Sequence, residues 1–430
     1  MSSSTSCAAE PSLNTPTPIP RAPDALARGA ADQACARPLR VFLFDLLPTV
    51  PYYTGHLAAA LSGVSNLELG LGAATYVRDR TFFQRIGLRK APGVFDFAAS
   101  FDSHPLRRGM KLAEYLWNMA ALAARFVRNK PDIVHVQFTP LLERRLPFEL
   151  WFLRTVHALG IKLMYTVHNI LPHENGDELR SAYASLYRLM DGFICHDYAA
   201  KERLIREFDV DRRLISVIPH GPLFSEMGDS AERSDRAPSS GKPVVLWQGI
   251  IRPYKGLSIL LRAWQRAIRS GMTAELVIVG TGNDEILESI RQQVCALEIE
   301  SSVRLDLRFV STEEVAEYYD EADLVVYPYS QITTSGALMT GIGRGKAIIA
   351  SDLPAFRQIL RHEKDALLAP PDDVNAWADA LVRLTSDSEL RARLAAQLSS
   401  HQTRLLPDWN AIARDTMRAY QSLNSLANIS

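Results

Sequence analysis

The segment from Val245 to Trp264, VLWQGIIRPYKGLSILLRAW, constrains the fold more than any other part of the chain. It opens with a near-continuous apolar run, which is typical of a strand buried on both faces of a parallel sheet. It closes with leucines spaced to lie on one face of a helix. Because parallel sheets are built from strand–loop–helix units of this kind, the segment predicts an α/β fold.

Between the predicted strand and helix, Arg252 and Lys255 lie three residues apart in a loop bounded by proline and glycine. Open α/β sheets bind ligands outside the carboxyl ends of their strands, and helix N-termini attract phosphate. Two cations at such a place favour a multiply charged anion as ligand. The alternative is that both side chains are simply solvated loop charges.

The alternation of strand-like and helical patterns runs through both halves of the 430-residue chain. A first helix is expected to begin near His56, after a loop that follows the first strand. The pattern predicts two doubly wound, Rossmann-like domains. Strands are expected at 40–47, 67–74, 132–138, 161–169, 192–197, 214–221, 243–248, 275–280, 303–309, 323–329, 346–351 and 366–370.

Composition shifts suggest the domain boundaries. Residues 1–38 are rich in Ser, Pro and Ala without the apolar core of a secretory signal, so a disordered leader is expected. An N-terminal domain is expected over 39–222, a polar linker over 223–242 and a C-terminal domain over 243–406. Residues 407–430 are expected to form a last helix, with Asp408 as its N-cap.

Charge and cysteine content argue against a nucleic-acid-binding protein and against a cysteine-ligated metal site. The formal net charge is zero, so no bulk polyanion is implied, and no nucleic-acid-binding motif occurs. Four scattered cysteines lack metal-ligand spacing, which is typical of reduced thiols in a cytoplasm. No metal is implied, because no Asp-x-Asp pair appears in a suitable context.

At this point the chain resembles the GT-B glycosyltransferases, in particular those of the family 4 type, from about residue 39 to 427. The resemblance rests on four elements in the expected order, two of them glycine motifs. They are G-x-x-R-P-x-K-G at Gly249–Gly256, V-G-x-G at Val279–Gly282, the segment Tyr327–Pro354, and Trp409 in the closing helix.

The resemblance implies that the two Rossmann-like domains face a cleft, with the closing helix packing back on the N-terminal domain. It implies that the C-terminal domain binds a nucleotide sugar and the N-terminal domain binds the acceptor. It implies that Arg252 and Lys255 neutralise the donor diphosphate. Gly280 and Gly282 would let the backbone approach the donor or merely form a tight turn, and Phe309 would lie beside the nucleobase.

The chain departs from the family where two glutamates, eight residues apart, are usual. Ile332 and Thr340 occupy those positions here. Thr334, Ser335 and Gly336 stand nearby at a helix start, where hydroxyls and free amides suit phosphate oxygens. Alternatively, the hydroxyls only cap the helix.

In the N-terminal half, the resemblance places Gly55 in a loop over the donor phosphates and His168 against the transferred sugar. A retaining enzyme of this type needs no protein nucleophile, whereas an inverting one needs a general base. Asp45 is the first candidate base and His56 the second. The sequence leaves the stereochemistry open.

Residues 76–130 contain eleven Lys or Arg against four Asp or Glu, interleaved with aromatic and aliphatic residues. A basic and aromatic surface beside an acceptor site suggests peripheral contact with an anionic membrane. Alternatively, the apolar residues face the domain core and the charges are solvated.

The resemblance, together with the basic surface, therefore implies a cytoplasmic glycosyltransferase on the inner face of the plasma membrane. It would move a hexose-type sugar from a UDP- or GDP-sugar to a lipid-linked glycan in exopolysaccharide or envelope synthesis. An NAD-dependent oxidoreductase is disfavoured, because G-x-G-x-x-G is missing after the first strand. A nucleotide-sugar epimerase and a non-catalytic nucleotide-sugar-binding partner protein remain as alternatives.

Overall fold

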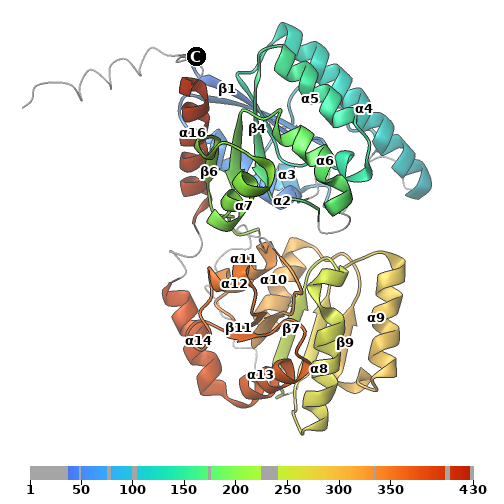
Figure 1. Cartoon of the computed structure of the whole chain (residues 1–430). Helices are drawn as coiled ribbons and strands as arrows, with labels where there is room; N and C mark the ends of the chain where they lie inside the picture. The colour runs from blue at the N-terminus through green and yellow to red at the C-terminus, as the bar shows by residue number, and fades with distance from the viewer. Residues whose placement is uncertain are drawn as a thin grey trace, which may run out of the picture. The chain divides into compact units, whose positions relative to one another are not determined.

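A computed structural model describes residues 37–47, 50–74, 79–98, 104–172, 176–223, 241–332, 335–401 and 407–426. Most of the expected leader and linker lies outside these ranges. Two six-stranded parallel sheets carry the described chain (Figure 1), as the strand and helix pattern predicts. The α/β fold class is thereby confirmed.

The N-terminal sheet has the order β2-β1-β3-β4-β5-β6. The chain winds outward from β1 to β2, then returns to the other side of β1 with β3. The order therefore reverses between β1 and β3, which makes their carboxyl ends the switch point where such sheets bind ligands. The strands are β1 (Leu39–Asp45), β2 (Leu67–Ala73), β3 (Ile133–Val136), β4 (Lys162–Val167), β5 (Gly192–Cys195) and β6 (Ile215–Val217).

Two apolar layers cover this sheet. One face packs against α4, α5, α6 and α7, and the other against α2 and the last helix, α16 (Figure 1). Side chains that alternate along β1 explain the division: Phe42 and Phe44 enter one layer, and Val41 and Leu43 the other. The helices are α2 (Pro51–Ser62), α3 (Phe82–Arg85), α4 (His104–Arg128), α5 (Phe148–Ala158), α6 (Gly176–Tyr187), α7 (Tyr198–Phe208) and α16 (Trp409–Leu426).

The C-terminal sheet has the order β12-β11-β10-β7-β8-β9, so its switch point lies between β7 and β10. The strands are β7 (Val244–Gln248), β8 (Glu275–Val279), β9 (Val303–Asp306), β10 (Leu324–Tyr327), β11 (Ala347–Ser351) and β12 (Leu367–Ala369). The helices are α8 (Leu257–Arg269), α9 (Asp284–Ala296), α10 (Thr312–Glu321), α11 (Gly336–Gly343), α12 (Pro354–Arg357), α13 (Val374–Ser386) and α14 (Ser388–Ser400).

The prediction of a loop up to His56 is wrong, because α2 already begins at Pro51. Proline suits the first turn of a helix, since its fixed φ is helical and its missing N–H has no partner there anyway. Gly55 and His56 are consequently buried helical residues. The expected strand ending at Phe309 is also too long, since β9 ends at Asp306.

Helix α16 packs against α2. Asp408 precedes it and accepts a hydrogen bond from the Ala411 amide at 2.5 Å, as expected of an N-cap. Trp409 donates from its indole nitrogen to the Pro222 carbonyl at 3.0 Å, and the Tyr420 hydroxyl lies 2.7 Å from Nδ1 of buried His135. These contacts fix α16 on the N-terminal sheet.

Candidate functional site

Lys255 lies at the carboxyl end of β7, beside the switch point of the C-terminal sheet. It ends a short 3₁₀ turn, Pro253–Lys255, that leads into α8. Its Nζ lies 5.9 Å from the ring centre of Trp247 and 5.6 Å from that of Tyr329. A Cβ on Gly249 would come within 2.8 Å of this nitrogen, so glycine leaves room for the ammonium group against the backbone.

The ammonium group of Lys255 has lost part of its hydration. Burial first, and then the positive charge of nearby Arg252, together lower the pKa of Lys255 to about 8. Arg252 itself is exposed. An anion bound beside Lys255 and Arg252 would raise the pKa of Lys255 again. It would offset the repulsion between the two cations and replace the water that the ammonium group has lost.

The loop after β10 brings a helix start to the same edge. Ser335 caps α11, since its Oγ accepts from the Leu338 amide at 3.2 Å, and it donates to the Tyr329 hydroxyl at 3.5 Å. Tyr329 thus links the Lys255 ammonium to the α11 N-terminus, whose first residue is Gly336. Thr334 lies outside the described residues.

Gly280 and Gly282 contact protein rather than open space. A Cβ on Gly280, whose φ is +149°, would lie 1.8 Å from the Gly249 carbonyl oxygen. A Cβ on Gly282 would lie 2.5 Å from Cγ2 of Ile286 and 3.3 Å from the carbonyl oxygen of Ile251, in the loop after β7. Both glycines therefore let the loops after β7 and β8 pack together, which accounts for them without a ligand. Phe309 is half-buried and follows the edge strand β9.

Asp45 ends β1 at the switch point of the N-terminal sheet and is 1% exposed. Its Oδ2 accepts from the Thr54 hydroxyl at 2.5 Å, whereas Oδ1 has no hydrogen-bond partner among the described residues. Burial raises the pKa of Asp45 to about 7, and the Thr54 hydrogen bond opposes that rise. A carboxyl group that titrates near neutral pH is suited to proton transfer.

Gly55 and His56 lie in α2 rather than in a phosphate loop. A Cβ on Gly55 would come within 2.5 Å of the Phe82 ring, so glycine serves the packing of α2 against α3. One ring nitrogen of His56, Nε2, lies 3.0 Å from the Leu223 carbonyl oxygen. Neither residue is presented on an open loop.

His168 follows β4 and belongs to a cluster of three histidines. His196 follows β5, and His220 lies three residues beyond β6. The ring centres of His168 and His196 are 5.0 Å apart, and those of His196 and His220 are 4.9 Å apart. Only His168 is in the set predicted from the sequence. His196 could have been found by the same signal, a histidine directly after a buried strand.

All three rings of this cluster are neutral at pH 7. Burial holds the pKa of His168 well below its usual range, and the neighbouring histidines lower it further. Burial likewise lowers the pKa of His196 to about 3 and that of His220 to about 4. Neutral imidazoles offer a lone pair that can accept a hydrogen bond from a hydroxyl or bind a metal.

Two family models match the chain. Residues 82–221 match the model described as Glycosyltransferase Family 4, and residues 242–387 match the one described as Glycosyl transferases group 1. The second match contains Arg252, Lys255 and the α11 N-terminus. The first contains His168, His196 and His220.

Curated relatives match about half of the chain or somewhat more. Phosphatidyl-myo-inositol mannosyltransferase of Mycolicibacterium smegmatis is 29% identical over 208 residues, or 48% of this chain and 52% of that protein. D-inositol 3-phosphate glycosyltransferase of Corynebacterium urealyticum is 24% identical over 296 residues, or 65% of this chain and 68% of that protein. The chain thus spans about half the length of the mannosyltransferase it matches.

Solved structures share the fold across nearly the whole chain. HepE of Anabaena, in complex with UDP and glucose, superposes with a TM-score of 0.68 at 16% identity and covers 89% of this chain and 99% of that one. Sucrose-phosphate synthase of Thermosynechococcus elongatus superposes with a TM-score of 0.69 at 16% identity and covers 91% and 100%. At such identities, the likeness extends to the architecture alone.

Proposed function

Because the chain is a family 4-like glycosyltransferase of the GT-B fold, we propose that it transfers a hexose-type sugar from a UDP- or GDP-sugar to a lipid-linked glycan acceptor. The observation that carries the proposal is the position of Lys255. Its ammonium group lies at the switch point of the C-terminal sheet, with Arg252 in the same loop and Tyr329 linking it to the start of α11.

The expected chemistry explains why cations belong there. As the glycosidic bond to the donor breaks, negative charge grows on the departing nucleoside diphosphate. Positive groups held at that place stabilise the transition state more than the ground state, which is the requirement for catalysis. Lys255 is partly dehydrated before the ligand arrives, so its interaction with the diphosphate is strong.

The acceptor side is proposed to use the carboxyl edge of the N-terminal sheet. His168 would contact a hydroxyl of the transferred sugar through its neutral ring. For an inverting reaction, Asp45 would take the acceptor proton and His56 is the next candidate. For a retaining reaction the departing phosphate oxygen takes that proton, and neither residue is needed as a base.

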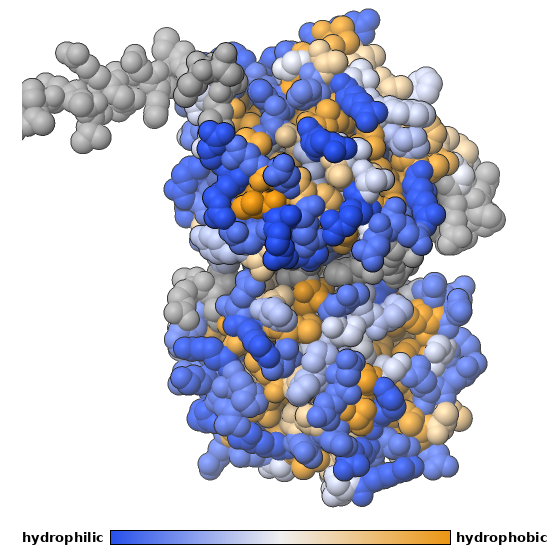
Figure 2. All heavy atoms as spheres, in the orientation of Figure 1, coloured by the Kyte–Doolittle hydropathy of each residue, from blue (hydrophilic) through white to orange (hydrophobic). Residues whose placement is uncertain are grey.

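A lipid-linked acceptor in envelope or exopolysaccharide synthesis is supported by the relatives and by one surface. The Mycolicibacterium smegmatis relative is named for mannosyl transfer to phosphatidyl-myo-inositol. In this chain, Phe95, Phe97, Leu112 and Trp117 are exposed on or beside α4, where apolar side chains are costly in water. Figure 2 shows apolar residues among hydrophilic ones over α4 and α5.

Polar side chains of α4 hold this exposed surface in place. Asn118 accepts from the Phe95 amide at 2.7 Å and donates to the Phe95 carbonyl at 2.9 Å. Glu114 accepts from the Ala98 amide at 2.7 Å. Phe82, Phe83 and Tyr115 are instead buried in the core, so only part of the interleaved apolar set of residues 76–130 faces solvent.

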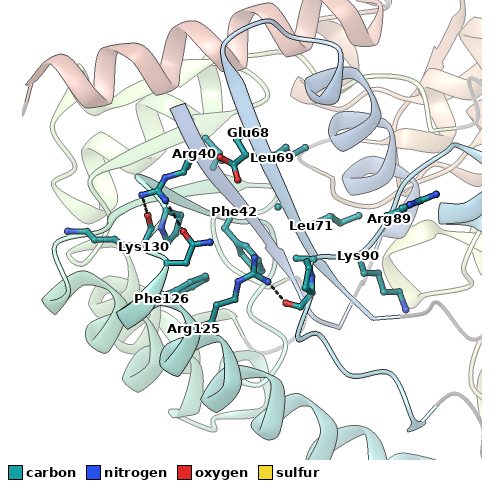
Figure 3. A pocket seen from close by; sticks show the side chains of 16 residues that line it. Arg40, Phe42, Glu68, Leu69, Leu71, Arg89, Lys90, Arg125, Phe126 and Lys130 are labelled. Carbon is teal, nitrogen blue, oxygen red and sulfur yellow. Dashed lines mark hydrogen bonds between the residues drawn. The ribbon is translucent and has the colours of Figure 1, made fainter. Parts of the chain in front are cut away.

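A basic pocket of about 320 Å³ opens on the same domain (Figure 3). It lies at the amino end of β1, away from the proposed sugar-transfer edge. Arg40 donates to Asn129 Oδ1 at 2.8 Å and to the Lys130 carbonyl, and Arg125 donates to the Pro92 carbonyl. The pocket's charged lining residues are Arg40, Glu68, Arg89, Lys90, Arg125 and Lys130, a net excess of cations that suits anionic headgroups.

Membrane contact at the inner face of the plasma membrane is therefore part of the proposal. Among the described helices, none combines the length and apolar character needed to cross a bilayer. Arg128 lies eleven residues after Trp117 on α4, which is about three helical turns, so both project from the same face. The membrane would meet aromatic and basic groups together on that face.

We expect the double variant Arg89→Gln/Arg128→Gln to bind phosphatidylserine-containing vesicles about 30-fold more weakly than wild type, because each cation contributes about 1 kcal/mol. Vesicle co-sedimentation measures this. The matched control is Arg262→Gln/Arg269→Gln, which removes two exposed charges from α8 of the other domain. Equal losses in both double variants would argue against a membrane-facing surface on the N-terminal domain.

The nucleotide is identified by a thermal-shift panel of UDP, GDP, ADP and their sugars. A ligand at 100 times its dissociation constant adds about 2.7 kcal/mol of stability, which raises the melting temperature measurably. We expect UDP or GDP to stabilise the protein and ADP to have little effect. Stabilisation without transfer to any glycolipid would support a non-catalytic partner protein, and release of an epimerised free nucleotide sugar would support an epimerase.

A further inference from the structure

The histidine cluster at the carboxyl edge of the N-terminal sheet has properties that sugar binding does not require. One ring nitrogen from each of His168, His196 and His220 lies within 4.8 Å of those of the other two. The three residues follow β4, β5 and β6, neighbouring strands of a parallel sheet. His168 and His196 directly follow β4 and β5, so adjacent parallel strand ends hold these two rings, and His220 joins them from three residues beyond β6.

Hydrogen bonds to carbonyl oxygens determine which ring nitrogens of His196 and His220 keep a lone pair. His196 Nδ1 lies 3.1 Å from the Ile218 carbonyl oxygen, and His220 Nδ1 lies 2.6 Å from the Gly221 carbonyl oxygen. A carbonyl oxygen only accepts, so both Nδ1 atoms carry the hydrogen. In neutral rings, Nε2 of His196 and Nε2 of His220 are therefore left with lone pairs.

His168 has two tautomers, and each meets a different partner. Its Nδ1 lies 3.1 Å from His196 Nε2, and its Nε2 lies 3.4 Å from Gln137 Oε1. With the hydrogen on Nδ1, His168 donates to His196. With the hydrogen on Nε2, it donates to Gln137 and turns a third lone pair towards that of His196.

In this second tautomer each histidine gives one N–H to an oxygen: His196 donates to Ile218 O, His220 to Gly221 O and His168 to Gln137 Oε1. Metal-bound histidines almost always donate their other N–H to a carbonyl, carboxylate or water in this way, because that bond fixes the tautomer and ring orientation. Two nitrogens at about 2.0–2.1 Å from a tetrahedral zinc lie roughly 3.3 Å apart. The His168–His196 separation of 3.1 Å is close to this value.

We propose that His168, His196 and His220 form a three-imidazole site for a divalent transition metal of the zinc class. Zinc is bound by neutral imidazole, and three protein ligands leave a fourth position for water or another oxygen. The depressed pKa values of the three rings fit this ligand chemistry, since protons do not compete for the lone pairs at neutral pH.

The test measures zinc binding to the full-length protein by competition with a chromophoric chelator, in the absence of any nucleotide sugar or acceptor. We expect one tight site per chain. His196→Asn retains an amide donor near the Ile218 carbonyl but removes the Nε2 ligand. It should weaken binding more than about 100-fold, because changes to outer partners alone cost about 10–100-fold.

Two further measurements separate ligand loss from misfolding. His220→Asn should weaken zinc binding to the same extent, and circular dichroism should show both variants folded. His157→Asn, which changes an exposed histidine on α5, should bind zinc as the wild type does. X-ray absorption of the zinc-loaded wild type should show three imidazole nitrogens at about 2.0–2.1 Å.

Equal zinc affinity in wild type and His196→Asn would overturn the site, as would sulfur scattering from a cysteine ligand. Equally weak zinc binding to the wild type and to all variants would also overturn the site, and the three histidines would then be a hydrogen-bonded structural group. The zinc measurement contains neither sugar donor nor acceptor. A protein that binds no zinc could therefore still transfer sugar, and a protein that transfers no sugar could still bind zinc.

Discussion

Lys255→Ala is expected to lower the turnover number for sugar transfer by about 10² to 10³, the loss typical of removing one group that stabilises developing negative charge. The Lys255 ammonium lies at the switch point of the C-terminal sheet and is already partly dehydrated. Alanine removes that charge where the diphosphate would leave. The measurement is steady-state transfer from the nucleotide sugar that the thermal-shift panel identifies.

The fold should survive this change. The Lys255 ammonium lies 5.9 Å from the ring centre of Trp247 and 5.6 Å from that of Tyr329, and each of these cation–π contacts contributes little to stability. Arg262→Ala is the matched control, because it removes an exposed cation from α8, the helix that follows the same loop. Unchanged turnover in Lys255→Ala, or an equal loss in Arg262→Ala, would refute the role assigned to Lys255.

Asp45→Asn is expected to stabilise the protein at alkaline pH and, for an inverting reaction, to lower its activity. Burial raises the pKa of Asp45 from 3.8 to about 7, so the folded state holds the proton more tightly than the unfolded state does. The resulting cost is absent below pH 3.8, grows as the pH rises, and is fully present above pH 7. Its size is on the order of 4 kcal/mol, and asparagine, which does not ionise, escapes it.

Chemical denaturation at several pH values measures this effect. The difference in unfolding free energy between Asp45→Asn and wild type should grow in favour of the variant from pH 4 to pH 8. A difference that stays constant with pH would contradict a raised pKa. A group that costs stability in this way is typical of a functional site, because selection for activity then outweighs selection for stability.

The activity of Asp45→Asn tests its role as a base. In an inverting transferase, loss of the general base is expected to cost about 10² to 10⁴ in turnover. Glu149→Gln is the control, because burial also raises the pKa of Glu149 to about 7, while its carboxylate accepts from the Leu141 and Leu142 amides of the core. If the product retains the anomeric configuration of the donor, the reaction is not inverting, and Asp45 is not its general base.

Where the sequence prediction held, the signals were local. The strand and helix around Lys255 were predictable because apolar runs and helical spacing lie within a single window of the chain. Asp408 was predictable as a cap because a capping residue acts within three positions of itself. The role of Gly55 was missed, because the glycine leaves space for Phe82, a partner distant in sequence.

The sequence by itself determined that the chain forms two parallel α/β sheets, and that a pair of cations follows the first strand of the second sheet. Hydrophobic periodicity and turn residues determine such features, because they act between near neighbours. Only the tertiary structure decided which strand ends lie together: β7 beside β10 around Lys255, and His168 with His196 and His220. Strand order depends on how crossover connections pack over each sheet, and that packing is settled by contacts between residues far apart in the chain.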